Sequence, residues 1–214
     1  MRFELHCHST CSDGSEPPER VAARAAERSV AVFALTDHDT DAGSGVPVAN
    51  GRSIRAVELS CTDDQQRTVH VLAYDRGGDW DVLACKLEGI REARTNRLKV
   101  MATKLERRGI KLDITKLREE AKSRSVGRPD LAKLMVAGKH ANSIKDAFSR
   151  HLFDGGPVDV PHKALALADA ITLGNAAGAA LSLAHPHMYD ERAAAMLRTF
   201  QSRGFWGVLA FVGV

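Results

Sequence analysis

Short apolar runs alternate with helical patterns along the first third of the chain. Runs bounded by polar residues predict strands at 3–5, 30–35, 54–59 and 69–74. Residues 15–29 predict a helix, because apolar residues recur there at helical spacing and two prolines lie in the first turn, where proline is tolerated. This alternation of strand and helix favours a parallel sheet or a barrel.

The pattern changes in the middle of the chain. Residues 80–150 have helical periodicity and almost no strand pattern, which indicates a helical insertion at 81–150. An α/β barrel body is then expected from residues 1–80 and 151–214. After the insertion, helices are predicted at 164–177 and 190–202, and strands at 180–184 and 205–212.

The composition fits one α/β body with a substantial core. The chain has 214 residues, of which 44% are hydrophobic and 27% are charged, as is ordinary for a globular protein. No apolar run approaches the roughly 18–20 residues that cross a bilayer, and the N-terminus lacks the apolar stretch of a signal peptide. Four cysteines without a paired framework predict reduced thiols. We therefore expect a cytoplasmic protein with no membrane segment.

The net charge of +3 conceals an asymmetry along the chain. Residues 86–150 hold 18 Lys and Arg against 8 Asp and Glu, whereas the remainder holds 12 against 19. One interpretation is a solvated helical face. The other is a basic cover that attracts an anionic substrate to an acidic, metal-collecting body. Aromatic residues make up only 5%, so a small phosphorylated ligand or a short oligonucleotide end fits better than a long nucleic acid.

Histidine and carboxylate side chains lie on the predicted strands or follow them. His6 and His8 flank one residue, so on a strand both imidazoles point to the same side. Asp13 follows in a turn, and four further candidates are His38, Glu58, His70 and His185. The carboxyl ends of barrel strands meet on one face, so these side chains are expected to converge there. Imidazole and carboxylate ligands together suit Zn, Mn or Fe, and a bridging carboxylate suits a site with several metals.

Several of these residues also have an ordinary structural explanation. A single histidine such as His70 is more often a hydrogen-bonded structural residue than a ligand, and Glu58 taken alone fits a surface carboxylate. Cys7 and Cys11 suggest a structural zinc site but lack the second pair that it needs. The other histidines lie in loops or in the helical segment and receive no ligand role; they are His140, His151, His162 and His187.

Short motifs in a fixed order along the chain resemble those of the PHP (polymerase and histidinol phosphatase) family. They are His6-Cys7-His8-Ser9 with Ser12-Asp13-Gly14, Thr36-Asp37-His38-Asp39-Thr40, Glu58, Val69-His70-Val71-Leu72, Gly127-Arg128-Pro129 and Leu183-Ala184-His185-Pro186. Their order and spacing are most similar to stand-alone bacterial members, which act as 3′,5′-nucleoside bisphosphate phosphatases and 5′→3′ exoribonucleases. The resemblance implies a distorted (β/α)7 TIM-like barrel with a helical insertion, and a cluster of up to three divalent metals.

The resemblance also implies a role for each matching residue. The first metal would be held by His6 and His8, with Glu58 bridging to the second. His70 and His185 would complete much of the second site, and Asp13 and His38 the third. His38 is also the candidate for proton transfer. Arg128 would pair with a substrate phosphate at a helix start, and Arg94 and Arg97 resemble the family's Arg-rich segment. For these arginines, helix-surface charge is the alternative explanation.

The chain departs from the family pattern in three places. Asp130 stands where the family has a histidine, and its charge is expected to weaken phosphate binding or to shift specificity. The stretch 41–53 is short and Gly-rich, so a loop is expected in place of a helix. No Asp-x-His motif follows His185, so the barrel is expected to be C-terminally incomplete. The apolar residues 205–214 would make a poor exposed edge, which a further segment, a partner or self-association would cover.

The sequence therefore predicts a metal-dependent phosphoesterase. Its expected substrate is a phosphomonoester of a small nucleotide, such as a nucleoside 3′,5′-bisphosphate, or a short oligonucleotide end. The alternative is a catalytically impaired relative that binds metal or nucleotide through the surviving ligands. The reason to consider it is the missing C-terminal Asp-x-His motif. A third reading, a proofreading exonuclease module of a polymerase, is disfavoured because no polymerase body is present.

Overall fold

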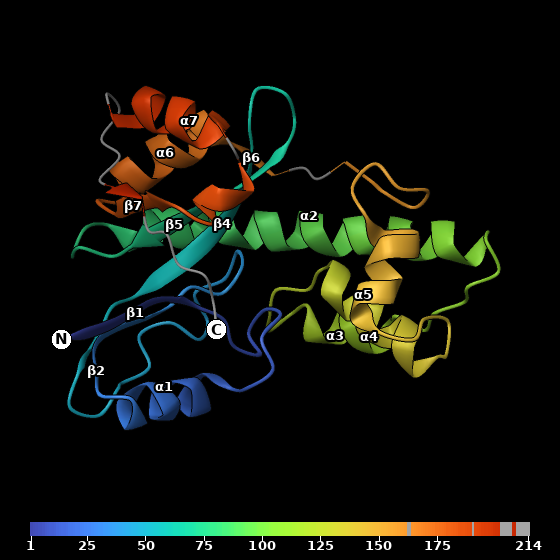
Figure 1. Ribbon diagram of the computed structural model, residues 1–214, viewed down its shortest axis with the longest axis horizontal. Coiled ribbons are helices and arrows are strands. Elements are labelled where there is room, and N and C mark those ends of the chain that lie inside the picture. The colour runs from blue at the N-terminus through green and yellow to red at the C-terminus, as the bar shows by residue number, and fades with distance from the viewer. Residues whose placement is uncertain (162–163, 190, 202–206, 209–214) are drawn as a thin grey trace. The chain divides into compact units, whose positions relative to one another are not determined.

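The computed structural model describes residues 1–161, 164–189, 191–201 and 207–208, and the chain divides into two compact units. The first unit comprises Met1–Glu88 and Ala164–Val214, and the second comprises Gly89–Lys163. Helix α2 (Trp80–Glu106) begins in the first unit and continues in the second. Figure 1 shows the course of the chain from the N-terminal strand to the C-terminal helix.

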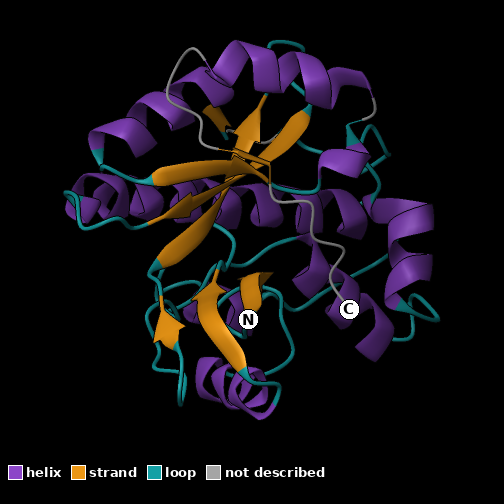
Figure 2. Cartoon of the chain, turned by 60° about the vertical axis from the view of Figure 1, so that its left-hand side comes forward, coloured by secondary structure: helices purple, strands orange, loops and turns teal. Residues whose placement is uncertain are grey.

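The first unit is an α/β structure with two sheets (Figure 2). One sheet has the order β1-β2-β3, and its strands are parallel; they are β1 (Arg2–Cys7), β2 (Val30–Leu35) and β3 (Arg52–Ser53). The other has the order β6-β4-β5-β7-β8, with strands β6 (Leu165–Ala166), β4 (Ala56–Thr62), β5 (Thr68–Tyr74), β7 (Ala180–Leu183) and β8 (Gly207–Val208). A single bridge between His38 and Glu58 connects the two sheets. The described residues thus form two joined sheets and no closed barrel.

The expectation of a parallel sheet is wrong for the middle of the second sheet, although β4 pairs with β6 and β7 with β8 in parallel. Strands β4 and β5 are antiparallel, and so are β5 and β7. The reason is the short connection between β4 and β5: a parallel pair needs a crossover of about a dozen residues or more, whereas Asp63 closes a tight turn here. Its carboxylate accepts hydrogen bonds from the backbone N–H groups of Gln65 and Arg67, each at 2.9 Å.

Helices flank the strands of the first unit. Helix α1 (Pro18–Glu27) is shorter than the predicted range 15–29 and starts three residues later, with Pro18 at its first position; it packs Ala22 and Ala25 in one cluster with Phe33 of β2. The other elements are α6 (Leu167–Ala176), a 3-10 turn (Pro186–Met188) and α7 (Glu191–Gln201). Residues 41–51 form turns and no helix, which confirms the expected loop. The predicted strand 205–212 is described only at β8; its other residues lie outside the described ranges.

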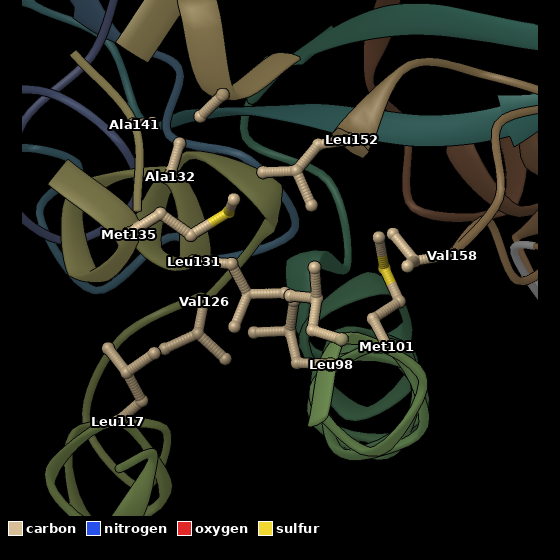
Figure 3. Packing of buried hydrophobic residues seen from close by; sticks show 12 residues of the cluster. Leu98, Met101, Leu117, Val126, Leu131, Ala132, Met135, Ala141, Leu152 and Val158 are labelled. Carbon is tan, nitrogen blue, oxygen red and sulfur yellow. The ribbon is translucent and has the colours of Figure 1, made fainter. Parts of the chain in front are cut away.

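The second unit is helical. It contains the rest of α2, then α3 (Thr115–Glu120), α4 (Arg128–Ala137), α5 (Ile144–Ala147) and a π-helical turn (Phe148–Leu152). Leu98 and Met101 of α2 pack with Leu131 and Met135 of α4 and with Leu152 (Figure 3). Burial of each such side chain contributes roughly 1.5–3 kcal/mol, which gives this unit a core of its own. No described helix has the length and apolarity to cross a bilayer.

Candidate metal centre

A single buried carboxylate lies at the centre of the candidate site. Glu58 is on β4 and is fully buried. Its Oε2 lies 3.1 Å from Nε2 of His6 and 3.1 Å from Nε2 of His8. The same oxygen lies 3.5 Å from Nδ1 of His38. The two rings thus converge as expected, although His8 directly follows β1 rather than lying within it.

The other oxygen of Glu58 faces two more imidazoles. Oε1 lies 3.1 Å from Nδ1 of His70 and 3.2 Å from Nε2 of His185. His70 comes from β5, which pairs with β4, and His185 follows β7, which pairs with β5. Five imidazoles from four strands and their following loops therefore surround one carboxylate. The alternative explanation of Glu58 as a surface carboxylate is wrong.

Asp13 lies at the rim of this cluster. Its carboxylate oxygens are 3.6 Å from Nδ1 of His8 and 3.8 Å from Nε2 of His38. Gly14 allows the turn that places it, because a Cβ there would lie only 2.6 Å from the carbonyl oxygen of His8. The Asp-Gly pair of the sequence is therefore required by close backbone packing.

The electrostatics of the cluster favour a charged Glu58 carboxylate and a neutral His38. Burial opposes ionisation of Glu58, but His38 and the other surrounding imidazoles hold the pKa of Glu58 well below its usual range. Burial lowers the pKa of His38 to about 4, and the neighbouring rings of His70 and His8 act in the same direction. Burial also favours neutral His8, but its hydrogen bond and attraction to Glu58 outweigh this and raise the pKa of His8.

The donor set fits divalent cations. Three sets of ligand atoms each lie within 4.8 Å of one another: His6–His8–Glu58, His8–Asp13–His38 and His38–Glu58–His70. Two buried atoms of the cluster, Nδ1 of His38 and Oε1 of Glu58, form no hydrogen bond of suitable geometry among the described residues, although each lies within 3.5 Å of a potential partner atom. A buried polar atom left unpaired costs roughly 1–3 kcal/mol, and a cation between these atoms would offset that cost. Nitrogen and carboxylate donors together suit Zn, Mn or Fe.

Two buried carboxylates on either side of His38 hold the ligand segments together. Asp37 accepts hydrogen bonds from Ser9 and Ser12, and Asp39 accepts from the backbone N–H and hydroxyl of Ser60, both at 2.7 Å. No role was predicted for either aspartate from the sequence. The signal was present in Thr-Asp-His-Asp, where two acidic residues flank a predicted ligand.

Two residues at the site have an uncommon backbone conformation. His185 has a φ of 47° and Asp39 a φ of 53°, in the left-handed region that favours glycine. Such a conformation costs on the order of 1–3 kcal/mol and persists where surrounding contacts enforce it. For Asp39 these contacts are the hydrogen bonds from Ser60, and they keep the segment after β2 beside β4.

The three predicted substrate-binding arginines all lie in the second unit. Nε of Arg97 donates to the carbonyl of Val160 at 2.6 Å, and its Nη2 lies 2.9 Å from Asp159. Burial and the charge of Arg128 lower the pKa of Arg97.

The other two arginines are also held by the scaffold. Arg128 pairs with Asp154 and lies over the ring of Phe148, with Cζ 5.8 Å from the ring centroid. Nε of Arg94 donates to the carbonyl of Val126 at 3.0 Å. All three guanidinium groups thus contact residues that directly precede α4 or lie at 154–160, and none is a freely solvated surface charge.

Asp130 caps helix α4. Its Oδ2 accepts from the backbone N–H of Gly127 at 2.8 Å, and its Oδ1 accepts from Nη2 of Arg124 at 2.9 Å. The side chain is buried, and an arginine and a helix N-terminus compensate its charge. The carboxylate of Asp130 is thus bound by Arg124 and by the backbone of Gly127, and its effect on phosphate binding stays a prediction.

Of the remaining histidines, only His187 is described in the first unit. His140 and His151 are in the second unit, and His162 lies outside the described residues. The ring of His187 is 6.3 Å from that of His185 and contacts no other ring in the described part of the chain. All four cysteines are free thiols, as the sequence predicts.

Comparison with known proteins places this geometry in a family. No family model matches the chain. It is 32% identical, over 96% of its length, to the 3′,5′-nucleoside bisphosphate phosphatase of Chromobacterium violaceum, and the match spans 75% of that protein. The chain belongs to the PHP family. Two further relatives are named 5′-3′ exoribonucleases. The one from Escherichia coli is 29% identical over 88% of the chain and 66% of its own length, and the one from Haemophilus influenzae is 29% identical over 88% and 70%.

Solved structures share the fold. A Bifidobacterium adolescentis protein described as a metal-dependent phosphoesterase superposes with a TM-score of 0.82 at 22% identity, over 97% of this chain and 76% of that one. A Chromobacterium violaceum amidohydrolase, solved with bound sulfate and without metal, gives 0.80 at 29% identity over the same shares. As a PHP member, the chain is a metal-dependent hydrolase of phosphoesters with an α/β fold.

Proposed function

We propose that this PHP protein hydrolyses the phosphomonoester of a small nucleotide, such as a nucleoside 3′,5′-bisphosphate, or acts at the 5′ end of a short oligoribonucleotide. The observation that carries the proposal is the buried carboxylate of Glu58 with five imidazoles around it. The named activities of the bacterial relatives give the two substrate classes.

The residues that would hold the cations are those of the cluster. We assign His6 and His8 to the first of up to three metals, His70 and His185 to the second, and Glu58 as the bridge between them. Asp13 and His38 are assigned to the third. Mn, Fe or Zn bound there would acidify a water molecule and neutralise charge on phosphoryl oxygens.

His38 is assigned to metal ligation and to proton transfer. Its pKa of about 4 keeps the ring neutral near pH 7, so a nitrogen lone pair is available. One ring nitrogen faces Glu58 and the other faces Asp13, which fits ligation first.

The guanidinium groups of Arg94, Arg97 and Arg128 are assigned to the phosphate or sugar that is not cleaved. Arginine recognises phosphate through paired N–H donors, and the scaffold contacts of these side chains reduce the entropy lost on binding. The helical insertion of residues 81–150 is assigned to substrate binding, and the (β/α)7 barrel expected of the family to metal binding.

The proposal is tested with purified protein and two substrates. Adenosine 3′,5′-bisphosphate and a 5′-phosphorylated oligoribonucleotide of a few residues are each incubated with Mn2+-loaded protein, and phosphate and mononucleotide are measured. We expect turnover of at least one of them, and loss of that turnover in Glu58→Gln. Metal-loaded protein that hydrolyses neither substrate would refute the proposed reaction.

A further inference from the structure

Asp37 lies beside the ligand cluster, and its carboxylate is held by donors from two serines. Its side chain is 1% exposed. Oδ1 accepts from the backbone N–H of Ser9 at 2.7 Å and from the hydroxyl of Ser12 at 2.6 Å, and Oδ2 accepts from the hydroxyl of Ser9 at 2.6 Å. Three short donors on one buried carboxylate form a built polar site rather than a chance contact.

These bonds connect three segments that carry ligands. Ser9 and Ser12 belong to the loop that runs from His8 to Asp13. The backbone carbonyl of Asp37 also accepts from the N–H of Glu58 at 3.2 Å, and the next residue along the chain is His38. One residue therefore fixes the loop after β1, the end of β2 and the middle of β4 relative to one another.

Ser12 extends the effect of Asp37 to a metal ligand. Its hydroxyl oxygen is 2.6 Å from Oδ1 of Asp37, 3.3 Å from Oδ1 of Asp13 and 3.5 Å from Nδ1 of His8. The single hydroxyl hydrogen goes to the shortest of these contacts, which is Asp37. The oxygen of Ser12 then faces Nδ1 of His8 as an acceptor, and this favours the His8 tautomer with hydrogen on Nδ1. Hydrogen on Nδ1 would leave the lone pair of Nε2, 3.1 Å from the carboxylate of Glu58, available to a cation; while no cation is bound, Nε2 keeps its hydrogen bond to Glu58.

We propose that Asp37 is a positioning residue of the metal centre, which acts through Ser12 and Ser9 to fix the tautomer of His8 and the loop that carries Asp13. This inference rests on the proposed metal centre. Partners that orient the ligands of a metal commonly change its affinity by about 10- to 100-fold.

The test compares three variants by Co2+ titration, with the visible absorption of bound Co2+ as the readout. Asp37→Asn removes the charge with little change of shape, and Ser12→Ala removes the link to His8. Asp63→Asn is the matched control, because Asp63 is also a buried carboxylate of the first unit that accepts backbone and arginine hydrogen bonds, but it holds the β4–β5 turn. Thermal unfolding of each variant is recorded in parallel.

We expect Asp37→Asn and Ser12→Ala each to weaken Co2+ binding by about 10- to 100-fold and to alter the absorption spectrum. The double variant is expected to bind Co2+ about as weakly as the weaker of the two single variants. Both substitutions interrupt the same chain of contacts from Asp37 through Ser12 to His8. Asp63→Asn should lower the unfolding temperature and leave affinity and spectrum unchanged.

The inference is overturned if Asp37→Asn binds Co2+ as wild type does, or if Asp63→Asn loses the same affinity. Wild-type protein that binds no Co2+ would overturn both the metal centre and this inference. Co2+ binding with the expected variant pattern but no hydrolysis of any phosphoester would refute the proposed reaction alone.

Discussion

Replacement of Gly14 by alanine should damage the metal centre without touching a ligand. A Cβ at this position would lie 2.6 Å from the carbonyl oxygen of His8, 2.7 Å from its carbonyl carbon and 2.8 Å from that of Ser9. Ordinary contacts of a Cβ begin near 3.4 Å, so the backbone on one side must move by about 0.6–0.8 Å. Backbone atoms cannot rotate away as a side chain can, and overpacking of this kind costs about 1–3 kcal/mol.

The displaced atoms belong to the segment between two proposed ligands, His8 and Asp13. We therefore expect Gly14→Ala to lower the free energy of unfolding by about 1–3 kcal/mol. Metal affinity should fall by about 10-fold or more, as it does when the surroundings of a metal ligand are disturbed. Urea unfolding followed by circular dichroism measures the first quantity, and competition with a chromophoric chelator measures the second.

Gly89 provides the control. It lies inside α2, and a Cβ there would meet no atom within 4 Å. Gly89→Ala should raise stability by up to about 1 kcal/mol through helix propensity and leave metal affinity unchanged. The reasoning is refuted if Gly14→Ala keeps both wild-type stability and wild-type metal affinity. It is also refuted if Gly14→Ala and Gly89→Ala lower the metal affinity equally.

Three further predictions concern other parts of the chain. Leu131→Ala in the fully buried core of the second unit should lower the free energy of unfolding by about 2–5 kcal/mol in urea titration; a loss under 1 kcal/mol would contradict the packing. Asp130→Ala should cost about 1 kcal/mol through loss of the α4 cap, and Asp130→Asn less; equal stability of both with wild type would remove the capping role. Burial raises the pKa of Cys61, so iodoacetamide should label exposed Cys85 in native protein and Cys61 only after unfolding. The labelled sites are identified by mass spectrometry, and labelling of Cys61 in the native protein would contradict the fold.

The sequence predicted the elements of the first unit well where the local pattern was strong. The strand 30–35 is observed with those bounds, because a buried parallel strand is a continuous apolar run. The antiparallel pairing of β4, β5 and β7 was missed, since strand direction depends on how the chain returns rather than on periodicity. The turn at Asp63 was the local clue, and its hydrogen bonds are visible only in the structure.

The convergence of ligands could be predicted in outline. Histidines at strand ends and a His-x-His pair pointed to one cluster, and the structure brings all seven proposed ligand residues together in the first unit. The supporting aspartates could not be found in the same way. Asp37 and Asp39 read as polar loop residues, and only the fold shows that both are buried and accept hydrogen bonds from distant serines. The cap by Asp130 depends likewise on its contact with Arg124.

The central claim is that Glu58 organises a metal centre from five imidazoles, and metal analysis tests it most directly. Wild-type protein and Glu58→Gln are purified identically, and bound Mn, Fe and Zn are quantified per chain by mass spectrometry, with the fold checked by circular dichroism. The account predicts at least one divalent metal per wild-type chain and a large loss of it in the folded variant. Equal metal content in the two proteins, or no metal in wild type after reconstitution, would contradict it.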